Sequence, residues 1–102
     1  MDPQELKRTT LAHCLPENAF HVQRGDVITN IYDLANCIES LSEAEFRQHV
    51  DPEGEFNHFA DWIRGVLGNP ELARDLNYDA NLRDKAHYVK TIRDHIAWLE
   101  SV

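Results

Sequence analysis

Apolar residues recur every three or four positions through most of the chain, which is the spacing of one face of an α-helix. The clearest example begins after Thr29 or Asn30, either of which can cap a helix. Its apolar positions are Ile31, Leu34, Ala35, Ile38 and Leu41. The pattern therefore predicts a protein built mainly of helices.

Capping signals divide residues 42–68 into two shorter helices. Ser42 and Glu45 match a capping box, in which each side chain accepts a backbone N–H at the start of a helix. The Asp-Pro-Glu-Gly sequence at 51–54 then predicts a turn. The second helix is expected to begin near Asn57 and end at Gly68, and to bury Phe59, Ile63 and Val66.

The remaining chain predicts two more helices. Asn69 and Pro70 fit a helix cap followed by a first helical residue. Asp79 is the predicted cap of the longest helix, residues 80–101, in which Lys85 is a misfit on the apolar face. The apolar positions of that helix are Leu82, Val89, Ile92, Ile96 and Leu99. The stripe is wide enough for a bundle, and we expect this helix to be the contact if the chain forms a homo-oligomer.

The first thirty residues follow a different pattern. Asp2 and Pro3 favour a helix or arm over residues 1–15, which Pro16 ends. In residues 16–29, apolar and polar positions alternate around an Arg-Gly-Asp turn, which predicts a small hairpin. The sequence thus predicts a single mainly α domain over residues 1–102. We expect a helical bundle of four or five helices over residues 30–101, preceded by one short N-terminal β-hairpin.

Composition narrows the class of function. The 102 residues are 42% hydrophobic and 27% charged, which fits one soluble globular domain with a modest core. The net charge of -8 argues against binding bare nucleic acid, which needs a basic face. An acidic inhibitor that mimics nucleic acid stays open, although basic residues are interspersed among the carboxylates. With no signal-like segment or long apolar run, we expect a cytoplasmic protein without membrane contact.

Candidate chemistry gathers between His49 and Trp62. His58 and Asp61 are three residues apart on a predicted helix, so with His49 they could ligate a metal in a small enzyme. Hydrogen bonding is the commoner role of histidines at helix ends. The sequence has no HExxH motif and no Gly-rich phosphate loop, and its two cysteines are too few for a disulfide framework. We therefore predict no catalytic residue and no cofactor.

The same segment is rich in aromatic residues. Phe59 belongs to the apolar helix face, whereas Phe56 and Trp62 could either pack in the core or stay partly exposed. Exposed aromatic side chains are typical anchors of protein interfaces. The sequence therefore predicts a non-enzymatic protein–protein interaction or adaptor module. Its candidate docking edge consists of His49, Phe56, Asn57, His58, Asp61 and Trp62.

Residues 16–76 resemble a family of small prokaryotic domains, common in archaea, whose function is unknown. The matching positions are His49, Val50, Asn57, Phe59, Ala60, Trp62, Ile63, Gly68, Glu71, Leu72 and Ala73. The chain departs from the family pattern at His58, where an aspartate is usual, and in a longer loop at 51–56. Members are often attached to other domains, so the resemblance implies an interaction role and no established activity.

Overall fold

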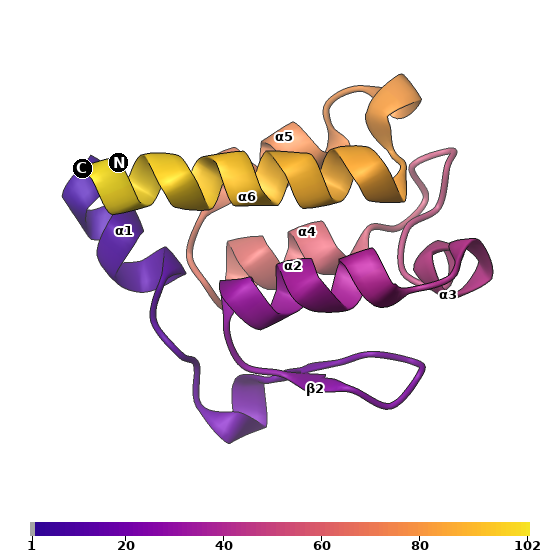
Figure 1. The fold of residues 1–102 in the computed structure, drawn as a ribbon, viewed down its shortest axis with the longest axis horizontal. Coiled ribbons are helices and arrows are strands. Elements are labelled where there is room, and N and C mark those ends of the chain that lie inside the picture. The colour runs from indigo at the N-terminus through magenta and orange to yellow at the C-terminus, as the bar shows by residue number, and fades with distance from the viewer. Residues whose placement is uncertain (1) are drawn as a thin grey trace.

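A computed structural model describes residues 2–102 and contains six α helices, two 3₁₀ turns and one two-stranded hairpin (Figure 1). The helices are α1 (Pro3–Thr10), α2 (Ile31–Ser40), α3 (Glu43–Arg47), α4 (His58–Gly65), α5 (Pro70–Asn77) and α6 (Lys85–Ser101). The strands are β1 (Phe20–His21) and β2 (Val27–Ile28), and the 3₁₀ turns are Pro16–Asn18 and Ala80–Leu82. The predicted mainly α class with an N-terminal hairpin is confirmed.

Two helix pairs enclose the core. The long helix α6 packs along α2, α4 packs against α5, and α5 also contacts α6 (Figure 1). Helices α2, α4 and α6 turn most of their predicted apolar positions inward, because burying them removes them from water. The fully buried residues with less than 2% exposure include Leu34 and Ile38 of α2, Phe59 and Ile63 of α4, Leu72 of α5, and Ile92 of α6.

The hairpin covers one side of this bundle, below α2 in Figure 1. Phe20 pairs with Ile28 and His21 with Val27 in antiparallel register. Gly25 closes the turn with a φ of 127°, a conformation that favours glycine. Phe20, Val22 and Ile28 are buried, so the hairpin adds its apolar side to the same core as the helices.

The last helix begins later than predicted. The Asp79 carboxylate accepts the Asn81 N–H of the 3₁₀ turn at 2.9 Å, and Asp84 is the cap of α6 instead. Leu82 is therefore outside α6 and is 41% exposed, which corrects its assignment to the apolar stripe. Lys85 is the first residue of α6, and its Nζ donates to the Leu41 carbonyl oxygen at 2.7 Å. The apparent misfit is a side chain that ties α6 to the end of α2.

The end of α4 corrects a second prediction. The helix ends at Gly65 with Val66 as its C-cap, and Val66 is 36% exposed rather than buried. Because the chain leaves the helical path here, Leu67 takes the core position and is 2% exposed. Gly68 has a φ of 64°, which lets the Asn69 N–H reach back to the Ile63 carbonyl oxygen at 3.1 Å.

The N-terminal segment follows its prediction only in part. Helix α1 starts with Asp2 as its cap but ends at Thr10. Cys14 is beyond the helix, and its N–H donates to the Thr29 carbonyl oxygen at 2.8 Å. Within residues 2–102, no helix combines the length and apolar character needed to cross a membrane.

Candidate functional site

The six predicted docking residues lie around the loop at 51–56 and helix α4, but they separate into two groups. Three are buried: His49 is 4% exposed, Asn57 6% and Trp62 7%. The other three, Phe56, His58 and Asp61, are at the surface. The expectation that Trp62 stays partly exposed is therefore wrong, because its ring packs into the core. The buried group holds the surface group in place.

His49 links the hairpin turn to the start of α4. Its Nε2 accepts the Gln23 backbone N–H at 3.1 Å, and its Nδ1 lies 3.2 Å from Nδ1 of His58. The His49 ring also packs against Phe20 and Phe59, with ring centroids 5.3 and 5.1 Å away. Burial, with a smaller effect of neighbouring His58, lowers the pKa of His49 and favours its neutral form.

Asn57 joins the start of α4 to α6. Its Oδ1 accepts the Ala60 N–H at 3.1 Å, so Asn57 caps the helix that was predicted to begin near it. Its Nδ2 donates to the Tyr88 hydroxyl at 2.6 Å, a contact between residues 31 positions apart. Burial raises the pKa of Tyr88 to about 12, so this hydroxyl is protonated at neutral pH.

Trp62 fastens the N-terminal segment to α4. Its Nε1–H donates to the Asn18 carbonyl oxygen at 2.8 Å, and its ring meets that of Phe20 edge-on at a centroid distance of 6.0 Å. Buried tryptophans usually pair their indole N–H in this way. Trp62 therefore holds residues far apart in sequence together.

The loop at 51–56 is held in one shape by its own hydrogen bonds. The Asp51 carboxylate accepts the N–H groups of Glu53 and Glu55 at 3.1 and 2.9 Å. The Asp51 N–H donates to the Phe56 carbonyl oxygen at 3.0 Å. An Asp side chain that binds nearby backbone N–H groups stabilises a turn. Arg83 adds an anchor from outside the loop, donating to the Pro52 carbonyl oxygen at 3.2 Å.

This loop presents Phe56 at the surface. The Phe56 side chain is 39% exposed, and its ring stacks on that of His58 at a centroid distance of 4.9 Å and an angle of 22°. Asp61 is one helical turn after His58 and pairs with Arg64 at 2.6 Å. The surface formed by Glu53, Glu55, Phe56, His58 and Asp61 is called the Phe56 face below.

The structure gives no support to the metal-binding alternative predicted from His49, His58 and Asp61, because the three side chains do not converge. The two imidazoles do meet, but their Nδ1 atoms are 3.2 Å apart and share a hydrogen bond. Asp61 pairs with Arg64 instead. Among residues 2–102, no three His, Cys, Asp or Glu side chains are arranged to hold a metal ion.

The acidic side chains are spread over the molecule. Carboxylates occur on the hairpin turn, on all six α helices and in the loops between them. In the described part of the chain, eight of the 18 form an ion pair with Arg or Lys. A mimic of nucleic acid would present a continuous row of free carboxylates, so this distribution gives it no support.

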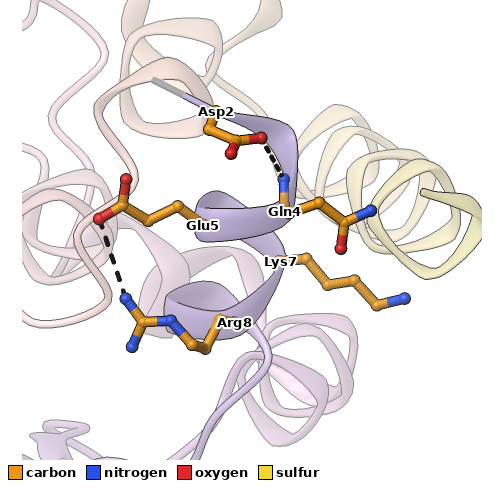
Figure 2. A pocket seen from close by; sticks show the side chains of 5 residues that line it. All are labelled: Asp2, Gln4, Glu5, Lys7 and Arg8. Atoms are coloured by element: carbon orange, nitrogen blue, oxygen red, sulfur yellow. Dashed lines mark hydrogen bonds and ion pairs between the residues drawn. The ribbon is translucent and has the colours of Figure 1, made fainter.

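Surface hollows lie away from the Phe56 face. One of about 640 Å³ follows α1, where Asp2 caps the Gln4 N–H and Glu5 faces Arg8 at 3.8 Å (Figure 2). Its side chains belong to one short helix and its cap, so it is an open surface rather than a binding cleft. A second, of about 560 Å³, lies between α2 and α6, where Arg93 binds Glu39 at 2.8 Å.

A buried polar centre on α5 escaped sequence reasoning. Asn69 was predicted as a helix cap, and its Oδ1 does accept the Leu72 N–H at 2.9 Å. Its Nδ2 also donates to Thr10 Oγ1 at 3.0 Å and contacts His95 Nε2 at 2.9 Å. These partners are on α1 and α6, so no local pattern signals them.

Comparison of the chain with known protein families, curated proteins and solved structures found no match. Function is therefore inferred from the geometry around α4.

Proposed function

We propose that the chain is a non-enzymatic protein-interaction module that acts in the cytoplasm and binds its partner through the Phe56 face. The observation that carries this proposal is an exposed aromatic ring on a loop of fixed shape. Phe56 is 39% exposed while the loop that bears it is held by Asp51 and Arg83. Aromatic anchors dominate binding energy, and a preformed loop loses little conformational freedom on binding.

The buried members of the predicted docking edge have a supporting role in this proposal. His49, Asn57 and Trp62 bind the hairpin, α6 and the N-terminal 3₁₀ turn, respectively. They hold α4 at a fixed position relative to those elements. A partner then meets Phe56 and His58 on a surface that is already ordered.

The charges around Phe56 define the chemistry of the partner. Glu53 and Glu55 are exposed and have no ion-pair partner among the described residues, whereas Asp61 is paired with Arg64. An apolar ring beside two free carboxylates complements a segment that presents an apolar side chain next to Lys or Arg. We therefore expect the partner to contribute a basic, partly apolar segment.

The proposal is tested with a matched pair of variants in the full chain. Phe56→Ser removes the anchor, and Trp98→Ser removes an aromatic side chain on α6 with similar exposure, 41% against 39%. Tagged wild type and both variants are used for affinity purification from the native cell. A partner recovered with wild type and with Trp98→Ser, but lost with Phe56→Ser, supports the proposal. Equal recovery with all three proteins would show that the Phe56 face is not the docking surface.

Charge reversal then tests the partner's chemistry. In Glu53→Lys/Glu55→Lys, the partner found with the wild type should bind at least tenfold more weakly at low salt. The matched control is Glu71→Lys, on α5. Because exposed charges are screened, the difference should shrink at high salt. Unchanged binding would contradict the proposed basic segment.

The other functions predicted from the sequence lack an observation of this kind. An acidic inhibitor, a small metal-binding enzyme and a homo-oligomer formed through the last helix each remain without a specific contact that favours them. The family resemblance stays a prediction, and the interaction role that it implies agrees with the present proposal.

A further inference from the structure

The bond between Gln23 and His49 fixes where the protons of two histidines lie. A backbone N–H can only donate, so Nε2 of His49 must present a lone pair to Gln23. A neutral imidazole carries one proton, which therefore lies on Nδ1 of His49. That proton points to Nδ1 of His58, 3.2 Å away, so neutral His58 must carry its own proton on Nε2. The three groups form a directed chain of donors and acceptors.

This chain cannot take up a proton without losing a hydrogen bond. The two ring nitrogens that carry no proton, His49 Nε2 and His58 Nδ1, each already accept a hydrogen bond. A proton on His58 Nδ1 places two donors face to face, and a proton on His49 Nε2 opposes the Gln23 N–H. Moving the His49 proton from Nδ1 to Nε2 merely transfers the conflict from one bond to the other.

The two sites differ in their access to water. The His58 ring is exposed, so its positive charge can stay hydrated, whereas His49 is 4% exposed. Opening the Nδ1–Nδ1 bond leaves an added charge in water, whereas opening the bond to Gln23 leaves it buried. The first proton therefore opens the Nδ1–Nδ1 bond, and the His58 ring turns away from His49. The movement disturbs the stack of His58 on Phe56, whose ring centroids are 4.9 Å apart.

We propose that His49 and His58 form a two-step proton switch, in which the first proton alters the Phe56 face and the second loosens the hairpin turn. The second step is protonation of His49 at lower pH, which breaks its bond to the Gln23 N–H. The pH sensitivity is a property of the folded chain and does not depend on the proposed partner.

No carboxylate offsets these steps by pairing with either imidazole in residues 2–102. Glu53 and Glu55 of the Phe56 face are free carboxylates, but neither pairs with an imidazole. The other charged groups on the surrounding elements are engaged elsewhere: Arg24 with Asp26 on the hairpin, Arg47 with Glu43 on α3, Asp51 with N–H groups of its own loop, and Asp61 with Arg64 on α4. The hairpin also keeps a second anchor, because Arg24 Nη2 donates to Ser40 Oγ at 2.9 Å. The second step thus loosens the turn without detaching it.

The test is nuclear magnetic resonance of the labelled full chain between pH 8 and pH 5. At pH 8, we expect the His49 proton on Nδ1, with a scalar coupling across the hydrogen bond to His58 Nδ1. The coupling should disappear when the pair takes up its first proton. The protection of the Gln23 amide from hydrogen exchange should fall about fivefold to tenfold as His49 titrates at lower pH, since one hydrogen bond contributes about 1 kcal/mol.

Two variants separate the steps. His58→Ala, at an exposed position, removes the first step and leaves the loss of Gln23 protection. His49→Gln retains an acceptor that does not titrate, so Gln23 protection should become independent of pH. A His49 proton on Nε2 at pH 8 would overturn the proposal. So would a Gln23 amide whose protection is unchanged through the titration of His49, or a coupling that persists down to pH 5. All these readouts are made without a partner, so they stand or fall separately from binding at Phe56.

Discussion

Two asparagines begin consecutive helices in the same way but connect them to different parts of the molecule. Asn57 at α4 and Asn69 at α5 each accept a backbone N–H through Oδ1, three residues ahead. Asn57 then makes one further contact, to Tyr88, whereas Asn69 makes two, to Thr10 and His95. Asn69 thus joins three helices on the side away from the loop, and Asn57 joins two helices beside it.

The two helix starts therefore have different roles. Asn69 is 0% exposed and all its contacts are internal, so we assign it to stability alone. Asn57 directly follows Phe56 and precedes His58, so it also positions the surface that we propose binds a partner. The same residue type in the same local role therefore has different consequences, which depend on the surrounding elements.

The largest effect is expected for Asn69→Ala. The change removes the helix cap and leaves Thr10, His95 and the Leu72 N–H without their partner, so the free energy of unfolding should fall by about 3 kcal/mol. Urea unfolding monitored by circular dichroism measures it. Asn69→Asp is the control because it keeps the cap acceptor, and it should lose less. A loss below that of Asn57→Ala would reverse the ranking of the two sites.

Asn57→Ala should lower the free energy of unfolding by about 2 kcal/mol, because one cap and one buried hydroxyl contact are lost. Tyr88 then has an unpaired hydroxyl in the core. The same urea experiment applies, with Asn57→Asp as the variant that keeps the cap. If Asn57→Ala weakened partner binding no more than Asn69→Ala did at equal folded fraction, its positioning role would be excluded.

Gly54→Ala sharpens the comparison at the loop itself. Gly54 has a φ of 86°, and an added Cβ would lie 2.9 Å from Nη1 of Arg83. The strain should cost about 1 kcal/mol in unfolding free energy. Gly65→Ala is the matched control, since a Cβ there meets nothing within 4 Å. Equal thermal stability of the two variants would indicate that the loop adapts and is less rigid than its hydrogen bonds imply.

Each asparagine has a pH-sensitive histidine nearby, and this permits a further comparison. Burial lowers the pKa of both His49 and His95 in the folded state, an effect that Asp75 and Glu71 oppose at His95. The unfolded chain then binds more protons than the folded chain. Each histidine's contribution to the free energy of unfolding is therefore complete above the pKa of histidine in the unfolded chain, about 6.5, and is lost as pH falls through its pKa in the folded chain. Unfolding free energies of wild type, His49→Gln and His95→Gln between pH 7.5 and pH 5 should show a smaller decline in each variant. A decline as steep as that of wild type would exclude that histidine as a source.

Local signals in the sequence predicted most of the secondary structure. The Ser42–Glu45 capping box and the cap at Asn69 are both present, and a helix does begin next to Asn57. Capping contacts span three residues and need no other element. The apolar periodicity gave a wrong prediction at the end of α4. Val66 continues the apolar pattern in the sequence, but Leu67 is the residue buried in the core. Asp79 was predicted as the cap of the last helix, but it caps the 3₁₀ turn and Asp84 caps α6.

The sequence predicted which segment holds the candidate site, but not the hydrogen bonds that its residues make. The sequence brought His49, Asn57 and Trp62 together with Phe56 because they are neighbours along the chain. It could not show that their polar atoms point to Gln23, Tyr88 and Asn18, which lie 26, 31 and 44 residues away. Such partners depend on the tertiary arrangement, and they turn an expected docking residue such as Trp62 into a buried support.

The ends of the described chain lie together, since Lys7 Nζ of α1 donates to the Val102 carbonyl oxygen at 2.8 Å. The loop that bears Phe56 is near α3, toward the opposite end of the long axis in Figure 1. That axis measures 35 Å. A domain joined to either terminus would therefore be attached at one end of the long axis, and a partner bound at the Phe56 face would be at the other end. In such a fusion the bundle would act as a rigid spacer that keeps the two apart by a distance of its own length.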